Sequence, residues 1–418
     1  MTADQPSPLV PKLRFAEFVG EPPWECPPLK KLAKRITQRN TQGAKLRALT
    51  NSAEHGVVDQ REYFDKDIAT STDNYYIVEA GDYVYNPRIS SIAPVGPISK
   101  NQIGTGVMSP LYAVFRFHSD ANDFFAHYFR SSHWHGYLRR VSNNGARHDR
   151  MAVTNDDLMQ LPIPTPSARE QQKIADCLGS LDDLIAAEGR KLEALRRHKQ
   201  ALMQQLFPQE GETQPRLRFP EFRGAGDWDD KSIGDFGQVV TGSTPSTAEP
   251  TFYGGEIPFV SPIDISDLRY VEETNTTLTE AGFKKTRPIR AGSVLFVCIG
   301  STIGKIAQTV RDCATNQQIN AVIPNAKYSD GFVYFALSNA SNRIALLAGK
   351  QAVPIINKSL FSSARLLVPR LPEQQRIADC LTPLADLVAA ETRKLDMLKA
   401  HRKGLMQQLF PSLGEADA

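Results

Sequence analysis

Residues 170–208 read EQQKIADCLGSLDDLIAAEGRKLEALRRHKQALMQQLFP, and residues 373–411 repeat this stretch as EQQRIADCLTPLADLVAAETRKLDMLKAHRKGLMQQLFP. A shorter stretch is also repeated, as PKLRFAEFVGEPPWE at 11–25 and as PRLRFPEFRGAGDWD at 215–229. The two pairs occur in the same order, and their spacings agree to within one residue. The chain therefore consists of two tandem half-chains.

Each copy of the long segment has the apolar periodicity of a helix. Apolar residues alternate in steps of three and four, which is the heptad pattern of a coiled coil. At about 1.5 Å per residue, a helix of about 38 residues would be roughly 55 Å long. One such helix alone would expose its apolar stripe, so we expect the two helices to pack on each other. The residues predicted to pair them are Ile174, Leu178, Leu181, Leu192, Leu195, Ile377, Leu381, Leu384, Leu395 and Leu398.

Charged residues interrupt this apolar stripe at equivalent positions. They are Glu188 and Lys199 in the first copy and Glu391 and Arg402 in the second. One antiparallel register places Glu188 against Arg402 and Lys199 against Glu391, and we predict that register. The alternative is that these side chains reach solvent and specify no register.

The composition is that of a globular protein without a strong overall charge. Of 418 residues, 41% are hydrophobic and 23% are charged, which argues against a disordered or collagen-like chain. The net charge is only +3, from 49 basic and 46 acidic residues, so any site for a polyanion must be local. The five cysteines form no CxxC pair that would suggest a zinc site. No apolar run suits a membrane and the amino terminus lacks a secretion pattern, so we expect a cytoplasmic protein without membrane contact.

The middles of the half-chains, residues 30–165 and 230–368, share little sequence. Each mixes short β-rich runs with turns and one expected helix, over Asn122–Tyr137 in the first and Gly331–Leu347 in the second. We therefore expect one α+β module in each half. Repeated ends around different middles would present two different surfaces in one symmetric arrangement, which favours recognition over catalysis.

Basic, amide and hydroxyl side chains cluster in the expected loops of both middles. Lys and Arg neutralise phosphates, while Asn, Gln and Arg can form paired hydrogen bonds with base edges. We predict a nucleic-acid surface, although any one such cluster is also what a solvated loop contains. The candidates in the first middle are Arg88, Lys100, Asn101, Gln102, Arg139, Arg140, Asn143, Asn144 and Arg147. Those in the second are Ser243, Thr244, Lys284, Lys285, Arg287, Lys305, Asn316, Gln317, Gln318, Lys350, Gln351, Asn357 and Lys358.

Patterns typical of an active site are weak. The stretch GSTIGK at 300–305 resembles a phosphate loop, but Ile306 follows Lys305 where the motif needs Ser or Thr. His133 and His135 are two residues apart on an expected helix, so they would not share a face and hold a metal. We expect neither catalytic residues nor metal ligands.

The sequence strongly resembles the specificity subunit of type I restriction-modification enzymes over nearly its whole length. The resemblance rests on the duplicated LRFxEFxG entries and on the EQQ to LMQQLFP tails. It also rests on TGSTPS at 241–246 and FYGGEIPF at 252–259 in the second middle, and on GDYVYNP at 81–87 and SPLY at 109–112 in the first. The sequence departs from the family at Ser243, where the family often has a second glycine.

This resemblance implies two target recognition domains in tandem, each followed by a long helix, with the helices packed as an antiparallel coiled coil with pseudo-two-fold symmetry. Each domain would read one half of a split, asymmetric sequence in double-stranded DNA. The helices would space the domains and dock two modification (methyltransferase) subunits. The implied bounds are residues 1–166 and 209–369 for the domains, 167–208 and 370–411 for the helices, and 412–418 for a tail.

The resemblance also implies that the chain itself is not an enzyme and holds no cofactor. S-adenosylmethionine would belong to the modification subunits, and ATP and magnesium would belong to the restriction subunits. The alternatives are a two-domain adaptor whose middles bind proteins, and an enzyme with an unrecognised site. Retention on heparin or duplex DNA at low salt would favour DNA binding over the adaptor.

Overall fold

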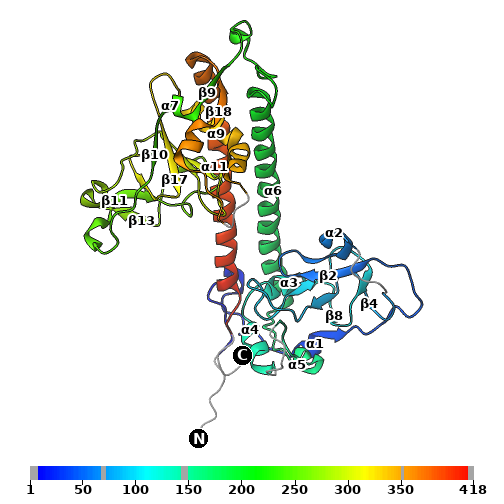
Figure 1. Cartoon of the computed structure of the whole chain (residues 1–418). Helices are drawn as coiled ribbons and strands as arrows, with labels where there is room; N and C mark the ends of the chain where they lie inside the picture. Colours follow the sequence, from blue (N-terminus) through cyan, green and yellow to red (C-terminus); the bar gives the residue numbers. More distant parts are fainter. Residues whose placement is uncertain (1–7, 67–71, 143–148, 350–352, 413–418) are drawn as a thin grey trace. The chain divides into compact units, whose positions relative to one another are not determined.

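The computed structural model describes residues 8–66, 72–142, 149–349 and 353–412. The chain divides into two compact units. Unit 1 comprises residues 1–186 and 397–418, and unit 2 comprises residues 187–396. Both units mix helices and strands (Figure 1), which confirms the expected fold class. Within the described residues, no helix is both long and apolar enough to cross a membrane.

Unit 1 contains two four-stranded sheets. Its strands are β1 (Ala33–Arg35), β2 (Ala48–Ser52), β3 (Gly56–Asp59), β4 (Tyr76–Val78), β5 (Tyr83–Tyr85), β6 (Ile98–Lys100), β7 (Gly106–Met108) and β8 (Ala113–Phe117). The first sheet has the order β1-β8-β5-β6 and is antiparallel throughout. The second has the order β3-β2-β7-β4, in which β2 and β7 are parallel.

The short helices of unit 1 are η1 (Ala16–Phe18), α1 (Leu29–Leu32), α2 (Gln60–Phe64), α3 (Asp123–Phe129), α4 (His135–Val141) and α5 (Asn155–Met159). The single helix expected over Asn122–Tyr137 is thus wrong, because the chain turns between α3 and α4. The buried Trp134 stabilises this turn, since its indole N–H donates to the carbonyl of Phe129 at the end of α3 (3.1 Å).

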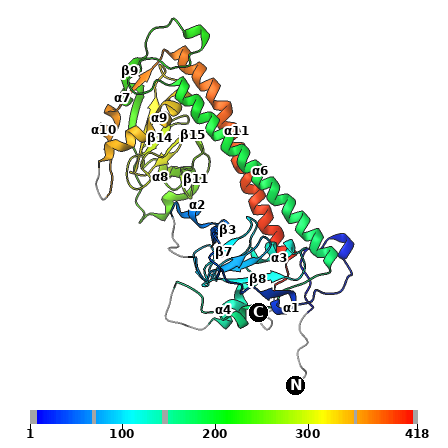
Figure 2. The same ribbon diagram turned by 90° about the vertical axis from the view of Figure 1, so that its right-hand side faces the viewer.

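Unit 2 has a five-stranded sheet in the order β10-β17-β14-β15-β12, a three-stranded sheet β13-β11-β16 and a two-stranded sheet β18-β9. The strands are β9 (Asp229–Ser232), β10 (Gly237–Thr241), β11 (Tyr253–Val260), β12 (Tyr270–Val271), β13 (Thr276–Leu278), β14 (Val294–Val297), β15 (Ile306–Thr309), β16 (Ala314–Thr315), β17 (Ile319–Pro324) and β18 (Arg365–Val368). The short helices are η2 (Pro220–Phe222), α7 (Ile233–Phe236), η3 (Pro250–Phe252), α8 (Glu280–Phe283), α9 (Asp330–Ala345), η4 (Leu346–Ala348) and α10 (Lys358–Ser363). Figure 2 shows α10 beside α7 in this unit.

The two units share a sheet topology that their sequences do not reveal. The order β1-β8-β5-β6 in unit 1 matches β10-β17-β14-β15 in unit 2, with the same antiparallel pairing. In each unit a parallel pair, β2 with β7 or β11 with β16, belongs to the second sheet. Gly81 and Gly292 take positive φ angles of 90° and 81° in equivalent turns before β5 and β14. The middles are therefore divergent sequences on one common fold.

The two repeated long segments form α6 (Ala168–Leu206) and α11 (Leu371–Leu409), which confirms the two long helices. The carboxyl end of each helix enters the core of the unit built by the other half-chain. Phe207, which follows α6, packs in the core of unit 2 with Trp228, and Phe410, which follows α11, packs in the core of unit 1 with Phe124. The repeated LMQQLFP sequence is therefore a docking segment.

A buried ion pair ties each repeated LRF entry to the start of a long helix. In unit 1, Arg14 forms a two-pronged pair with Glu170 (2.8 and 2.7 Å), and in unit 2 Arg218 forms the equivalent pair with Glu373 (2.8 Å each). Both glutamates are nearly fully buried. This pair explains why the entry and the EQQ sequence are repeated together.

The apolar positions predicted to pair the helices are mostly buried, but those near the helix starts pack mainly in the unit cores. Ile174 and Leu178 lie in the core of unit 1, and Ile377 and Leu381 lie in the core of unit 2. The remaining buried positions are Leu192 and Leu395, and the half-buried ones are Leu181, Leu195, Leu384 and Leu398.

The predicted charge register of the helices is wrong, although the antiparallel direction is right. In unit 2, Glu188 pairs with Lys394 and Lys191 pairs with Glu391, each at 2.5 Å. A later residue of α6 thus meets an earlier residue of α11, as antiparallel helices require. In unit 1, Arg402 pairs with Asp182. Residues seven or eight apart lie on the same helix face, so the heptad pattern alone could not distinguish Lys394 from Arg402 as the partner of Glu188.

Lys199 therefore lacks the predicted carboxylate, and we expect Lys199→Met to stabilise unit 2. Burial lowers the pKa of its ammonium group, and the charges of Arg196 and Arg269 lower it further. The charged form is thus disfavoured by folding, and an apolar side chain of similar length should raise the free energy of unfolding by about 1 kcal/mol. Urea denaturation measures the change. Lys327→Met, at an exposed position of unit 2, is the control, and equal effects of both variants would contradict the explanation.

Candidate nucleic-acid interface

In unit 2 the predicted polar residues converge on one edge of the five-stranded sheet, namely the edge formed by the ends of its strands. At this edge β10 and β14 end and β17 and β15 begin, because Thr241 pairs with Asn320, Val297 with Ile319 and Phe296 with Ile306. The segments 242–244, 298–305 and 316–318 leave or enter the strands here. We call these three segments the loop edge of unit 2.

Hydrogen bonds hold two of these segments together. The hydroxyl of Thr244 donates to the side-chain carbonyl of Gln317 (2.8 Å), and the hydroxyl oxygen of Ser243 accepts from the backbone N–H of Arg287 (3.2 Å). The Arg287 guanidinium donates to the backbone carbonyl of Thr241 (2.8 Å). Gln317 and Arg287 are nevertheless exposed. The structure thus brings together residues that are up to 76 positions apart, from Thr241 to Gln317.

A close backbone contact explains the glycine in the TGSTPS sequence. A Cβ atom on Gly242 would lie 2.1 Å from the carbonyl oxygen of Asn316 and 2.3 Å from that of Thr315. The next residue, Ser243, donates its N–H to the Thr315 carbonyl (2.9 Å). Only glycine lets the two segments approach this closely.

The turn before β17 presents amide groups in a defined arrangement. The Asn316 side chain donates to the side-chain carbonyl of Gln318 (3.0 Å) and accepts from the backbone N–H of Gln318 (3.1 Å). These bonds orient the turn, and the side chain of Gln317 beside them is exposed. Such an amide can donate to and accept from the edge of an adenine base.

Other candidates in unit 2 flank the loop edge or serve the fold. Lys284 and Lys285 are exposed just after α8 and close in sequence to Arg287, and Lys358 is exposed at the start of α10. Lys305 is half-buried, and its ammonium donates to the carbonyl of Ile265 (3.0 Å). The side-chain oxygen of Asn357 caps α10 by accepting from the N–H of Leu360 (2.9 Å). Lys350 and Gln351 lie outside the described residues.

In unit 1 the candidates separate onto opposite sheet edges. Arg88 is exposed in the segment after β5, at the edge equivalent to the loop edge of unit 2. Lys100, Asn101 and Gln102 lie at the end of β6, on the opposite edge. Only Gln102 among these three is exposed.

The prediction that Asn101 binds DNA is wrong. Asn101 is fully buried, and its side-chain N–H groups donate to the carbonyls of Glu79 (2.8 Å) and Gly104 (2.9 Å). Lys100 is also committed within the unit, since its side chain is 14% exposed and its ammonium pairs with Asp123 at 2.7 Å. Both residues therefore hold the turn after β6 instead of facing a ligand.

Helix α4 carries two further candidates on its surface. Arg139 and Arg140 are exposed, and the Arg140 guanidinium lies 5.6 Å from the centre of the Tyr137 ring. Burial lowers the pKa of His135, at the start of the helix, to about 4, so it adds no charge at neutral pH. Asn143, Asn144 and Arg147 lie outside the described residues.

Apolar residues that the sequence does not single out are exposed at the equivalent edge of unit 1. Ile92 is 65% exposed in the segment between β5 and β6 that also holds Arg88, and Leu111 is 63% exposed in the segment before β8. The neighbouring Tyr112 is held by a hydrogen bond between its hydroxyl and that of Thr50 (3.1 Å). Because both residues are apolar, composition alone predicts that they lie in a core. Leu111 stood out in the sequence only as part of the SPLY motif at 109–112.

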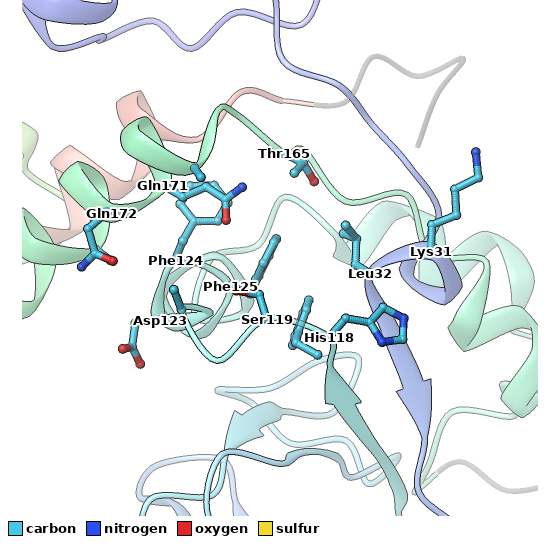
Figure 3. Close-up of a pocket in the computed structure, with 14 residues that line it drawn as sticks. Lys31, Leu32, His118, Ser119, Asp123, Phe124, Phe125, Thr165, Gln171 and Gln172 are labelled. Atoms are coloured by element: carbon cyan, nitrogen blue, oxygen red, sulfur yellow. The ribbon is translucent and has the colours of Figure 1, made fainter.

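Unit 1 also has a small hollow away from this edge, near the start of α6. Its volume is about 260 Å³. Figure 3 shows it lined by Phe124 and Phe125 of α3, Gln171 of α6 and His118, which follows β8.

Buried cysteines and possible metal-binding side chains are further candidates for reactive groups of the chain. Burial raises the pKa of the Cys298 and Cys313 thiols to about 12, so neither is a thiolate at neutral pH. Across the part of the chain that the structure describes, no group of three or more His, Cys, Asp or Glu side chains is arranged to hold a metal ion.

The two units share the order of four strands in their main sheets, and each exposes side chains from loops at the same end of those strands. This duplicated arrangement is typical of a recognition protein with two binding modules. Comparison with known families agrees with this class. The model of the type I restriction modification DNA specificity domain matches residues 56–197 and 225–400, which together are more than half of the chain. The chain belongs to this family.

Curated relatives carry the same description. The chain is 32% identical over 147 residues to the type I restriction enzyme HindI specificity subunit of Haemophilus influenzae, covering 34% of this chain and 32% of the relative. It is 28% identical over 262 residues to the EcoR124I/EcoR124II specificity subunit of Escherichia coli, covering 59% and 61%. The matched part thus spans between about a third and three fifths of these relatives.

Solved structures show the same fold. The S subunit of a type I restriction-modification system from M. genitalium is similar with a TM-score of 0.63 at 14% identity, covering 97% of this chain and all of that one. A chain from a structural study of type I complex assembly and conformational transition has a TM-score of 0.51 at 16% identity, covering 93% and 97%.

Proposed function

We propose that this chain is the non-catalytic specificity subunit of a type I restriction-modification complex, and that each unit reads one half of a bipartite, asymmetric duplex DNA target. The observation that carries the proposal is the loop edge of unit 2, where three distant segments meet and display the exposed Gln317, with the exposed Arg287 hydrogen-bonded to Thr241 beside it. The equivalent edge of unit 1 displays different residues on the same strands, as reading a different half-target requires.

The residues at and beside the loop edge divide by chemistry into two roles. The exposed cations of Lys284, Lys285 and Arg287 would neutralise phosphates, which gives affinity but little sequence preference. The amides of Gln317 and Gln318 would bind base edges in the major groove, which gives sequence preference.

The remaining parts of the complex belong to partners in this proposal. The long helices would space the two units along DNA and dock two modification subunits, and restriction subunits would join that assembly. S-adenosylmethionine would be held by the modification subunits, and ATP and magnesium by the restriction subunits. The support is the repeated LRF entry, ion pair and helix, which give one partner type two equivalent surfaces.

Replacing Asn316, Gln317 and Gln318 together with alanine should reduce discrimination between the cognate duplex and a scrambled one. Each paired contact is worth about 1–3 kcal/mol, so we expect a loss of tenfold or more. Titration of the full chain with both duplexes measures this, once methylation mapping in the source genome has defined the target.

Two further variants sharpen the test. Gln317→Ala alone leaves the Asn316–Gln318 bonds of the turn in place. It should reduce discrimination between the two duplexes, but by less than the triple variant. Gln238→Ala, at an exposed position of β10, should change nothing. Unchanged discrimination in the triple variant would show that other residues of unit 2 make the base contacts.

A further inference from the structure

A short apolar segment extends the loop edge of unit 2. Residues 353–356 run antiparallel to residues 298–300, where Gly300 donates its N–H to the Pro354 carbonyl (3.0 Å) and Ile356 donates to the Cys298 carbonyl (2.8 Å). Ile299 and Ile355 form the β-bridge between them. The segment then leads into α10, which Figure 2 labels in unit 2.

This pairing turns alternate side chains in opposite directions, as in any extended strand. Ile356 is 1% exposed and belongs to the core of unit 2. Its neighbour Ile355 is 45% exposed, and Val353, two positions earlier, is 55% exposed. Two β-branched apolar side chains therefore face outward from a backbone that hydrogen bonds hold in place.

The segment that carries the exposed pair lies close to the turn that carries the amide groups. A Cβ atom on Gly300, the residue bonded to Pro354, would lie 3.7 Å from the side-chain nitrogen of Gln318. Gln318 in turn is bonded to Asn316, beside Gln317. Gly300 therefore links the segment that carries the exposed pair to the turn that carries the amide groups.

We infer that Val353 and Ile355 contact the C5-methyl groups of thymine in the half-target read by unit 2. This inference rests on the proposed function. The thymine methyl is the apolar group that base-pair edges present in the major groove. The adenine of the same pair presents the N6 and N7 atoms that a glutamine side chain binds. An apolar pair beside exposed amides therefore fits A·T pairs read on both bases at once.

The test replaces thymine with uracil, which removes only the methyl group. The full chain is titrated with duplexes in which every thymine of the unit 2 half-target is uracil, or in which only thymines of the unread gap are uracil. We expect affinity to fall about three- to fivefold for each contacted methyl in the first duplex and to stay constant in the second. Val353→Ala/Ile355→Ala should bind the thymine and uracil duplexes equally.

Val310→Ala is the matched control, because Val310 is 46% exposed just after β15, at the opposite edge of the sheet. This variant should keep the sensitivity to uracil. Thermal unfolding of all variants checks that the exposed substitutions leave the fold intact.

Other results would contradict either the methyl contact, its assignment to Val353 and Ile355, or the proposed function. If the chain prefers its cognate duplex but tolerates uracil, or if the half-target lacks A·T pairs, the methyl contact is wrong and the proposed function stands. If the double variant stays sensitive to uracil, other residues read the methyl groups and the assignment is wrong. If the chain shows no preference for any duplex, the proposed function itself fails. If Val353→Ala/Ile355→Ala weakened binding to cognate and scrambled DNA equally, the assignment would also be overturned.

Discussion

Glu373→Ala is expected to lower the free energy of unfolding of unit 2 by about 3–5 kcal/mol, the cost of breaking a buried ion pair from one side. The Arg218 side chain is 7% exposed and that of Glu373 is 3% exposed, so the variant would leave an unpaired guanidinium away from water. The indole N–H of Trp228 also donates to Glu373 (3.3 Å) and would lose its acceptor. One substitution thus strands two buried donors.

The effect should be confined to one unit, and local hydrogen exchange can show this. Peptides from 209–370 should lose protection in Glu373→Ala, while peptides from unit 1 should not. Glu170→Ala, which breaks the equivalent pair with Arg14, should show the reverse pattern.

An exposed ion pair in the same unit provides the control. Glu221 pairs with Arg376 at 3.3 Å, and both side chains are about half exposed. Glu221→Ala should change the free energy of unfolding by less than about 1 kcal/mol. If Glu373→Ala cost no more than Glu221→Ala, the duplicated pair would not hold the entry segments to the helices.

Phe410→Ala is expected to destabilise unit 1 by about 3–5 kcal/mol, because it opens a cavity where the end of α11 docks. Phe410 is 1% exposed, and its ring centre lies 5.4 Å from that of Phe124 and 5.6 Å from that of Tyr128. These edge-to-face contacts add to the free energy of burying the ring. The end of α11 should therefore separate from unit 1 more often in the variant.

The equivalent residue provides the reciprocal experiment. Phe207 lies 5.7 Å from Phe332 and 6.0 Å from Trp228, so Phe207→Ala should destabilise unit 2 by a similar amount. Met397, 66% exposed on α11, is the control, and Met397→Ala should have little effect. Loss of protection from hydrogen exchange in the same unit for both Phe207→Ala and Phe410→Ala would contradict the crossed docking.

The long helices and the duplication were predictable because both depend on local information. A heptad pattern needs only neighbouring residues, and a repeat is visible without any contact. The charge pairs of the helices were not predictable, since Glu188 meets Lys394 instead of Arg402. Cations about two turns apart share a helix face, so the heptad pattern does not distinguish between them.

The candidate site was predictable by residue type and not by position. Lys-Asn-Gln at 100–102 and Asn-Gln-Gln at 316–318 look alike as sequences, yet Asn101 is buried with its donors satisfied, while Gln317 is exposed at the loop edge. Val353 and Ile355 were missed for the opposite reason, because apolar side chains indicate a core until burial is known.

The amino-acid sequence by itself determined that this protein is a duplicated chain with two long helices, two α+β modules and the motifs of a specificity subunit. The tertiary structure alone decided that the modules share one topology, that each helix end docks in the other half's unit, and which polar groups meet at the loop edge. The physical reason is that periodicity and repeats are properties of neighbouring residues, whereas exposure and hydrogen-bond satisfaction depend on strands and turns brought together from distant positions.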